Sequence, residues 1–113
     1  MLAINVRIIS DIVIFDMTGR FSFMEFKLHE TAKGLLKAGS RAFILNLTEV
    51  SYVDSFAVGQ MFSIWTSMRA KEGHVMLLRP NDAVKKVLQA TKLDTIFQIF
   101  ADEAEAVAHL KSS

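Results

Sequence analysis

The segment at residues 50–59, VSYVDSFAVG, places a carboxylate beside a hydroxyl where an alternating apolar/polar run ends. Asp54 can accept hydrogen bonds from the first free amides of a following helix, so it is a strong N-cap. Ser55 would then lie at the first helical position, where the positive end of the helix dipole tolerates a phosphate. The junction can therefore act as a cap alone or as a phosphorylation site.

Other kinds of site chemistry find little support in the sequence. Cysteine is absent, and we find no glycine-rich phosphate loop and no G-x-S-x-G elbow. Asp16 stands within a predicted strand, where we expect it to face solvent or a cap. The histidines lack the i, i+4 spacing of a metal site; they are His29, His74 and His109. We therefore expect no catalytic residue, no metal and no cofactor.

Composition limits the kind of protein this is. The chain has 113 residues, a hydrophobic content of 51% and a net charge of +1. We therefore expect one folded domain over residues 1–113, with no electrostatic case for binding nucleic acid. No apolar run approaches the length of a membrane span, and the N-terminus lacks the pattern of a signal peptide. The predicted location is the cytoplasm, without direct insertion into a membrane.

Strand and helix patterns alternate along the chain. Residues 4–8 and 12–17 predict a hairpin that ends at Thr18-Gly19. Ser22 and Glu25 match a capping box for a helix running to about Ala38. The later elements are a strand at 42–47, a helix from Asp54 to Glu72 stopped by Gly73, a strand at 74–78, a helix capped by Asn81 or Asp82, a strand at 96–100 and a helix from Asp102.

This order, β-β-α-β-α-β-α-β-α, predicts an α/β fold with four helices. The opening hairpin makes the sheet mixed, whereas the strands at 42–47 and 74–78 are expected inside it and parallel. Functional sites of such sheets tend to lie outside the carboxyl ends of the strands. Asp54 and Ser55 leave the 42–47 strand region at such an end.

A helical wheel for the segment after Asp54 predicts which residues face the core. At about 100° per residue, one arc holds the predicted core face, namely Val58, Met61, Phe62, Trp65 and Met68. Phe56 falls on the opposite side with Gln60, Ser63 and Ser67. Its ring is either an ordinary exposed apolar side chain, a cover for the loop Gly19 to Phe21, or a contact for a partner.

The stretch LNLTEVSYVDSFAVG resembles the signature of STAS domains, named for sulfate transporters and anti-sigma factor antagonists. That signature is an apolar strand followed by Asp-Ser-[Ser/Thr]-Gly at the start of a helix. Thr18-Gly19 and the segment from Arg79 to Val107 also match the family pattern, although Lys92 replaces a glycine there. The resemblance covers nearly the whole chain and implies a STAS-like mixed sheet.

The resemblance implies regulation by protein binding. In bacterial partner switching, an antagonist STAS protein binds a kinase-like anti-sigma factor and frees the sigma factor for transcription. Phosphorylation of the second hydroxyl residue in Asp-Ser-[Ser/Thr] breaks that complex and so transmits the signal. The alternative role is a STAS scaffold, or a subunit of a lipid or anion transport system that binds a permease or ATPase. Whether the protein also forms a homodimer stays open.

This sequence departs from the family at the phosphorylated position. Phe56 stands where the acceptor hydroxyl is usual, Ala57 replaces the glycine, and Arg20 and Ser22 replace two carboxylates in a loop. We therefore expect no phosphorylation at the usual position, with Ser55 as the alternative acceptor. The expected partner surface consists of Asp54, Ser55, Phe56, Ala57, Gln60, Arg20 and Phe21.

Overall fold

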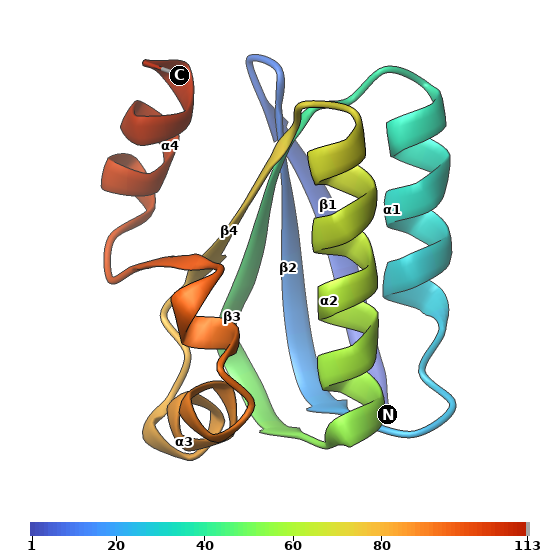
Figure 1. Ribbon diagram of the computed structural model, residues 1–113, viewed down its shortest axis with the longest axis vertical. Coiled ribbons are helices and arrows are strands. Elements are labelled where there is room, and N and C mark those ends of the chain that lie inside the picture. The colour runs from blue at the N-terminus through green and yellow to red at the C-terminus, as the bar shows by residue number, and fades with distance from the viewer. Residues whose placement is uncertain (113) are drawn as a thin grey trace.

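A five-stranded sheet forms the centre of the structure, a computed structural model that describes residues 1–112 (Figure 1). The strands lie side by side in chain order: β1 (Leu2–Ile9), β2 (Ile12–Phe21), β3 (Ala42–Val53), β4 (His74–Leu78) and β5 (Gln98–Phe100). The helices are α1 (Lys27–Lys37), α2 (Ser55–Ala70), α3 (Asp82–Ala90) and α4 (Glu103–Lys111), with a short 3₁₀ helix at Leu93–Thr95.

The pairing of the strands confirms the predicted mixed sheet. β1 runs antiparallel to β2, whereas β2, β3, β4 and β5 pair in parallel. β3 and β4 are inner strands, as their apolar sequences predict. The predicted order of elements is also correct, apart from the 3₁₀ helix that precedes β5.

Helices cover both faces of this sheet. α1 and α2 lie side by side on one face, and α4 lies on the other (Figure 1). The larger core lies beneath α1 and α2, where Phe15 and Phe43 meet edge to face at 5.1 Å. α4 covers a smaller core that includes Ile44 and Leu110. None of the helices within residues 1–112 combines the length and apolar character needed to cross a membrane.

The strands β2 and β3 are longer than the sequence predicts. β2 does not stop at Thr18-Gly19 but continues to Phe21, with register shifts on both sides of that pair. Gly19 has φ +106°, and a Cβ there would lie 2.3 Å from the carbonyl oxygen of Met1. This glycine therefore accommodates an irregularity inside the strand and does not end it.

The predicted capping box before α1 is wrong. α1 begins at Lys27, and its N-cap residue, Phe26, makes no side-chain capping bond. The carboxylate of Glu25 accepts instead from the backbone amide of Leu2 at 2.9 Å, while Ser22 closes a backbone turn with Glu25. The glutamate is thus used to hold the start of β1.

The predicted phase of α2 is partly wrong. Met61 and Met68 are buried as expected, but Phe62 is 47% exposed and Trp65 is only half-buried, with the two rings stacked at 5.8 Å. The buried face follows Ala57, Gln60, Met61, Ile64 and Met68. Apolar residues occur on most sides of this helix, so the wheel gave no unique arc.

The end of α2 also differs from the prediction. The helix stops at Ala70, and Glu72 rather than Gly73 takes the left-handed conformation, with φ +59°. A Cβ on Gly73 would lie 2.9 Å from the carbonyl oxygen of Arg41. Gly73 is therefore required by the close approach of two backbones.

A polar network joins α4 to the sheet and corrects the expectation for Asp16. Arg7 donates to the carboxylate of Asp16, at 3.0 Å for one of two bonds, and to Glu103 at 2.6 Å. The side-chain amide of Asn46 donates to Asp16 as well. Asp16, on β2, therefore faces partners on the two neighbouring strands, β1 and β3, and not solvent or a cap.

Acid should weaken this network in a defined pH range. Hydrogen bonds from Arg7 lower the pKa of Asp16 below its usual value of 3.8. A lowered folded-state pKa contributes stability that is present above the unfolded pKa and is lost as the pH falls through the folded one. We predict that Asp16→Asn lowers the melting temperature at pH 7 and that its difference from the parent shrinks towards about pH 3.

Thermal melts followed by circular dichroism at several pH values test this prediction. Asp11→Asn, at an exposed carboxylate in the β1–β2 turn, is the matched control and should change the melting temperature little. A difference for Asp16→Asn that stays constant from pH 7 to pH 3 would contradict the prediction.

Candidate functional site

The candidate site lies where β2 and β3 end together. Phe21 and Val53 pair at the carboxyl ends of these strands, and α2 begins two residues after Val53. The loop at residues 22–26 leaves β2 at the same end and leads into α1 (Figure 1). The first turn of α2 and this loop are therefore neighbours, as expected for a parallel sheet.

Asp54 joins the loop to the helix. One oxygen of its carboxylate accepts from the amide of Ala57 at 2.9 Å, which is the predicted N-cap bond. The other oxygen accepts from the amide of Phe23 at 2.9 Å. Its own amide donates to the carbonyl of Phe21 at 3.3 Å. Sequence reasoning identified the cap but missed the bond to Phe23, which no local pattern could indicate.

Phe56 belongs to an aromatic cluster. Its ring meets Phe23 at 5.6 Å and Phe26 at 5.2 Å between centroids, both edge to face. Phe56 is half-buried, so its expected place on the solvent side is wrong, and its ring packs on residues 23 and 26 rather than on the segment Gly19 to Phe21. Its neighbours are more exposed, since Phe23 is 68% exposed and Met24 and Phe26 are also exposed. We call Phe23, Met24, Phe26 and Phe56 the aromatic patch.

The remaining residues of the expected partner surface differ in how deeply they are buried. Phe21 and Ala57 are fully buried. Gln60 is only 8% exposed, and its amide donates to the carbonyl of Glu25, so its predicted place on the solvent side is wrong. Ser55 and Arg20 are exposed, and the guanidinium of Arg20 stacks on the ring of Tyr52 at 4.2 Å.

The arrangement favours recognition over acid–base work. Within residues 1–112, no group of three or more histidine, aspartate or glutamate side chains could hold a metal ion. The carboxylate of Asp54 is engaged by two backbone amides. Ser55 presents its hydroxyl at the first helical position, whereas Phe56 presents only a ring. What the site offers is an apolar surface on a backbone held by hydrogen bonds.

Most of the chain matches the model of one protein family. The model of the STAS domain matches residues 3–106. The chain belongs to the STAS domain family. A sequence relative from Thermotoga maritima, a candidate anti-sigma factor antagonist, is 33% identical over 76 residues, which is 67% of each chain.

Solved structures of the family share the fold of this STAS domain. A crystal structure of a candidate anti-sigma factor antagonist from Thermotoga maritima has a TM-score of 0.86, with 28% identity over 96% of this chain and 94% of that one. The Bacillus cell fate determinant SpoIIAA in its phosphorylated form has a TM-score of 0.77, at 22% identity over 95% and 98%. A sulfate transporter family protein from Wolinella succinogenes has a TM-score of 0.75, at 18% identity over 93% and 88%.

Lys92 occupies the position where the STAS pattern has glycine. Its backbone is left-handed, with φ +64°, at the residue that precedes the 3₁₀ helix. Glycine adopts this conformation without a steric penalty, whereas a lysine is strained by roughly 1 kcal/mol. The chain thus places a lysine in a backbone turn that favours glycine.

The double role of Asp54 leads to a prediction for Asp54→Asn. An asparagine can still cap Ala57, but its amide group would face the amide of Phe23, donor against donor. We predict faster hydrogen exchange of the Phe23 amide, by about tenfold or more, with α2 intact. Exchange measured by NMR checks this. The control is Asp102→Asn, since Asp102 caps α4 through the amide of Glu105. Equal acceleration of hydrogen exchange at the Phe23 amide by the two changes would contradict the role of Asp54 in the loop.

Proposed function

We propose that this STAS domain is a non-catalytic regulatory module that acts like an anti-sigma factor antagonist and binds a protein partner through the aromatic patch. Ser55 and Arg20, both exposed, also belong to the proposed surface. The observation that carries the proposal is the patch itself, which holds exposed aromatic and methionine side chains at the carboxyl end of the strands. The partner is an anti-sigma factor of the kinase-like type, and the setting is the bacterial cytoplasm.

The composition of the patch supports a role as an interface. Aromatic residues and methionine are enriched in the centres of protein interfaces, and polar residues form their rims. Asp54 fixes the backbone of Phe23, and Phe56 supports the rings of Phe23 and Phe26 from below. A surface that is ordered before binding loses less entropy when a partner docks. The buried Phe21, Ala57 and Gln60 support the patch without touching the partner.

The same geometry argues against a phosphate switch at the usual position. Phe56 has no hydroxyl, and its ring is enclosed by two other rings. We propose that the affinity of this domain is not controlled by phosphorylation at the start of α2, at residue 55 or at residue 56. Ser55 is exposed at the start of α2 and is the alternative acceptor.

A kinase assay tests the absence of the switch. Incubation with an anti-sigma-type kinase and ATP should leave the intact mass of the domain unchanged, because Phe56 cannot accept a phosphate. Mass spectrometry of the intact protein is the measurement, with Phe56→Ser as the variant that restores a hydroxyl. A stoichiometric gain of one phosphate on Ser55 in the parent chain would contradict the proposal.

Replacement of Phe23 tests the binding surface. Phe23→Ser removes an exposed ring and should change the melting temperature little. It should lower the affinity for the partner by about thirtyfold if the ring is a hot spot of the interface. Ile8→Ser is the control, because Ile8 is 65% exposed on β1 and outside the patch. The parent domain is used to capture the partner from cell extract. The affinity of the purified partner for the parent and for each variant is then measured by titration. Equal binding by parent and Phe23→Ser would place the partner elsewhere.

A role as a transport-system subunit is the second candidate. The structural likeness to a sulfate transporter family protein shows that the same fold occurs in that setting. Recovery of a permease or a transport ATPase from the extract, lost with Phe23→Ser, would assign the patch to that role. Recovery of a kinase-like anti-sigma factor would assign it to partner switching.

A further inference from the structure

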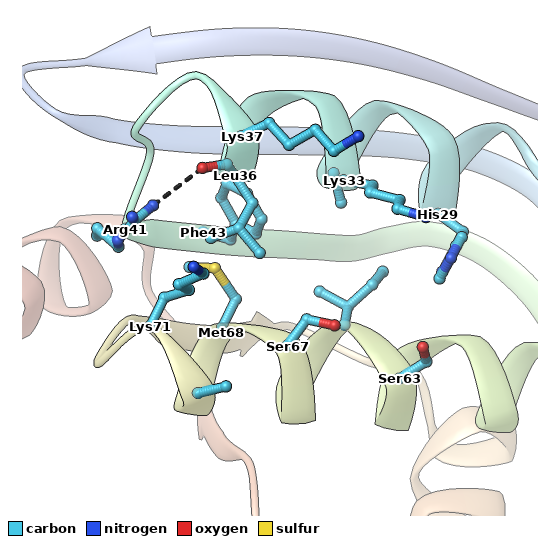
Figure 2. Close-up of a pocket in the computed structure, with 13 residues that line it drawn as sticks. His29, Lys33, Leu36, Lys37, Arg41, Phe43, Ser63, Ser67, Met68 and Lys71 are labelled. Carbon is cyan, nitrogen blue, oxygen red and sulfur yellow. Dashed lines mark hydrogen bonds between the residues drawn. The ribbon is translucent and has the colours of Figure 1, made fainter.

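A groove separates α1 from α2 on the face of the sheet that these helices cover. Its volume is about 670 Å³, within the range of roughly 300–1,000 Å³ that is usual for small-molecule sites. Figure 2 shows side chains from both helices, with Arg41 and Phe43, around this space. The groove is separate from the aromatic patch, which lies on the first turn of α2 and on the loop that enters α1.

The floor of the groove is apolar. Leu36 from α1, Phe43 from β3 and Met68 from α2 line it, and Figure 2 shows their side chains lying between the two helices. Ala32 and Ile64 continue this lining along the helices. An apolar floor contributes affinity through the surface it removes from water, and it favours a ligand with a hydrocarbon part.

The rim of the groove is cationic. Lys33, Lys37 and Lys71 line it, and within residues 1–112 no carboxylate lies within ion-pair distance of them. Arg41 also lines the groove and donates to the carbonyl oxygens of Leu36, at 3.0 Å, and Ser40. No aspartate or glutamate is among the lining residues. This set of donors fits an anion.

The placement of the cations goes beyond what helix ends alone explain. Cations near helix C-termini offset the helix dipole, which accounts in part for Lys37 and Lys71. Lys33 stands in the middle of α1, where that effect is small. At the opposite end of the groove lie Ser63 and His29, and Nδ1 of His29 is buried without a hydrogen-bond partner.

We propose that this groove binds a single-chain anionic amphiphile, with a carboxylate or phosphate head and one acyl chain. The head lies among Lys37, Arg41 and Lys71, and the chain runs over the apolar floor towards Ser63 and His29. The path along α1 from Lys37 to His29 is eight residues, or about 12 Å at the rise of a helix. A nucleotide fits less well, because the one phenyl ring among the lining residues, Phe43, is buried and offers no exposed stacking face.

Titration of the isolated domain tests the chemistry of the ligand. Decanoate and decyl phosphate, each below its micelle concentration, are compared with decyltrimethylammonium, acetate and inorganic phosphate by calorimetry. We expect both anionic amphiphiles to bind at least about tenfold more tightly than the cation of equal chain length and than either head group alone. Vesicles with and without anionic phospholipid form a separate arm, because a lipid head group carries the same charge.

Paired substitutions locate the site. The double variant Lys37→Gln/Lys71→Gln should weaken decanoate binding about tenfold or more. The matched control is Lys85→Gln/Lys86→Gln on α3, which removes two exposed lysines outside the groove and should leave binding unchanged. Ser67→Phe, at an exposed position on the groove wall, should block the chain and also abolish binding. Amide shifts on titration should fall in residues 29–37 and 63–71.

Three results would overturn the proposal. They are no binding by decanoate or decyl phosphate, equal binding by decyltrimethylammonium, and binding to anionic vesicles without binding to the dispersed amphiphiles. The experiment needs no protein partner, and Phe23→Ser should titrate like the parent chain. Failure of the proposed partner surface and failure of this site are therefore distinguished.

Discussion

The carboxylate of Asp54 holds together the parts of the molecule on which the candidate site depends. One oxygen caps α2 and the other fixes the backbone of Phe23, so a single side chain links β3, α2 and the loop that enters α1. A neutral cap could satisfy the helix, but only two acceptor oxygens serve both amides at once. The position of the aromatic patch follows, since Phe23 and Phe26 reach Phe56 only when the loop lies against the first turn of α2.

The sheet makes this linkage possible. β3 is apolar on both faces, so it takes a central place, with Phe43 beneath α1 and α2 and Ile44 beneath α4. Parallel pairing then brings the carboxyl ends of β2 and β3 to one edge, where Asp54 can reach the loop. On the other face, Arg7 bridges Asp16 and Glu103 and so fixes α4 through charges where apolar contact is limited.

Much of the fold could be predicted because its signals are local. The apolar run at 42–47, the caps Asp54 and Asn81, and the alternation of strands and helices depend on neighbours in the chain. The errors arose where a residue serves a distant partner: Glu25 binds the amide of Leu2, Gly19 accommodates Met1, and Asp16 binds Arg7. The phase of α2 failed for another reason, because that helix carries apolar residues on several sides and packs against both the sheet and α1.

The candidate site shows the same division. Its location and its cap followed from the junction at Asp54, but the burial of Gln60 and the packing of Phe56 depend on the loop that precedes α1. That loop also determines how the two surfaces of the domain relate. Phe26 immediately precedes α1, and His29 lies one turn further along the same helix, at the end of the groove. Because Phe26 immediately precedes α1 and Phe56 lies in the first turn of α2, a change in the separation of these two helices, which form the groove walls, alters the aromatic patch as well.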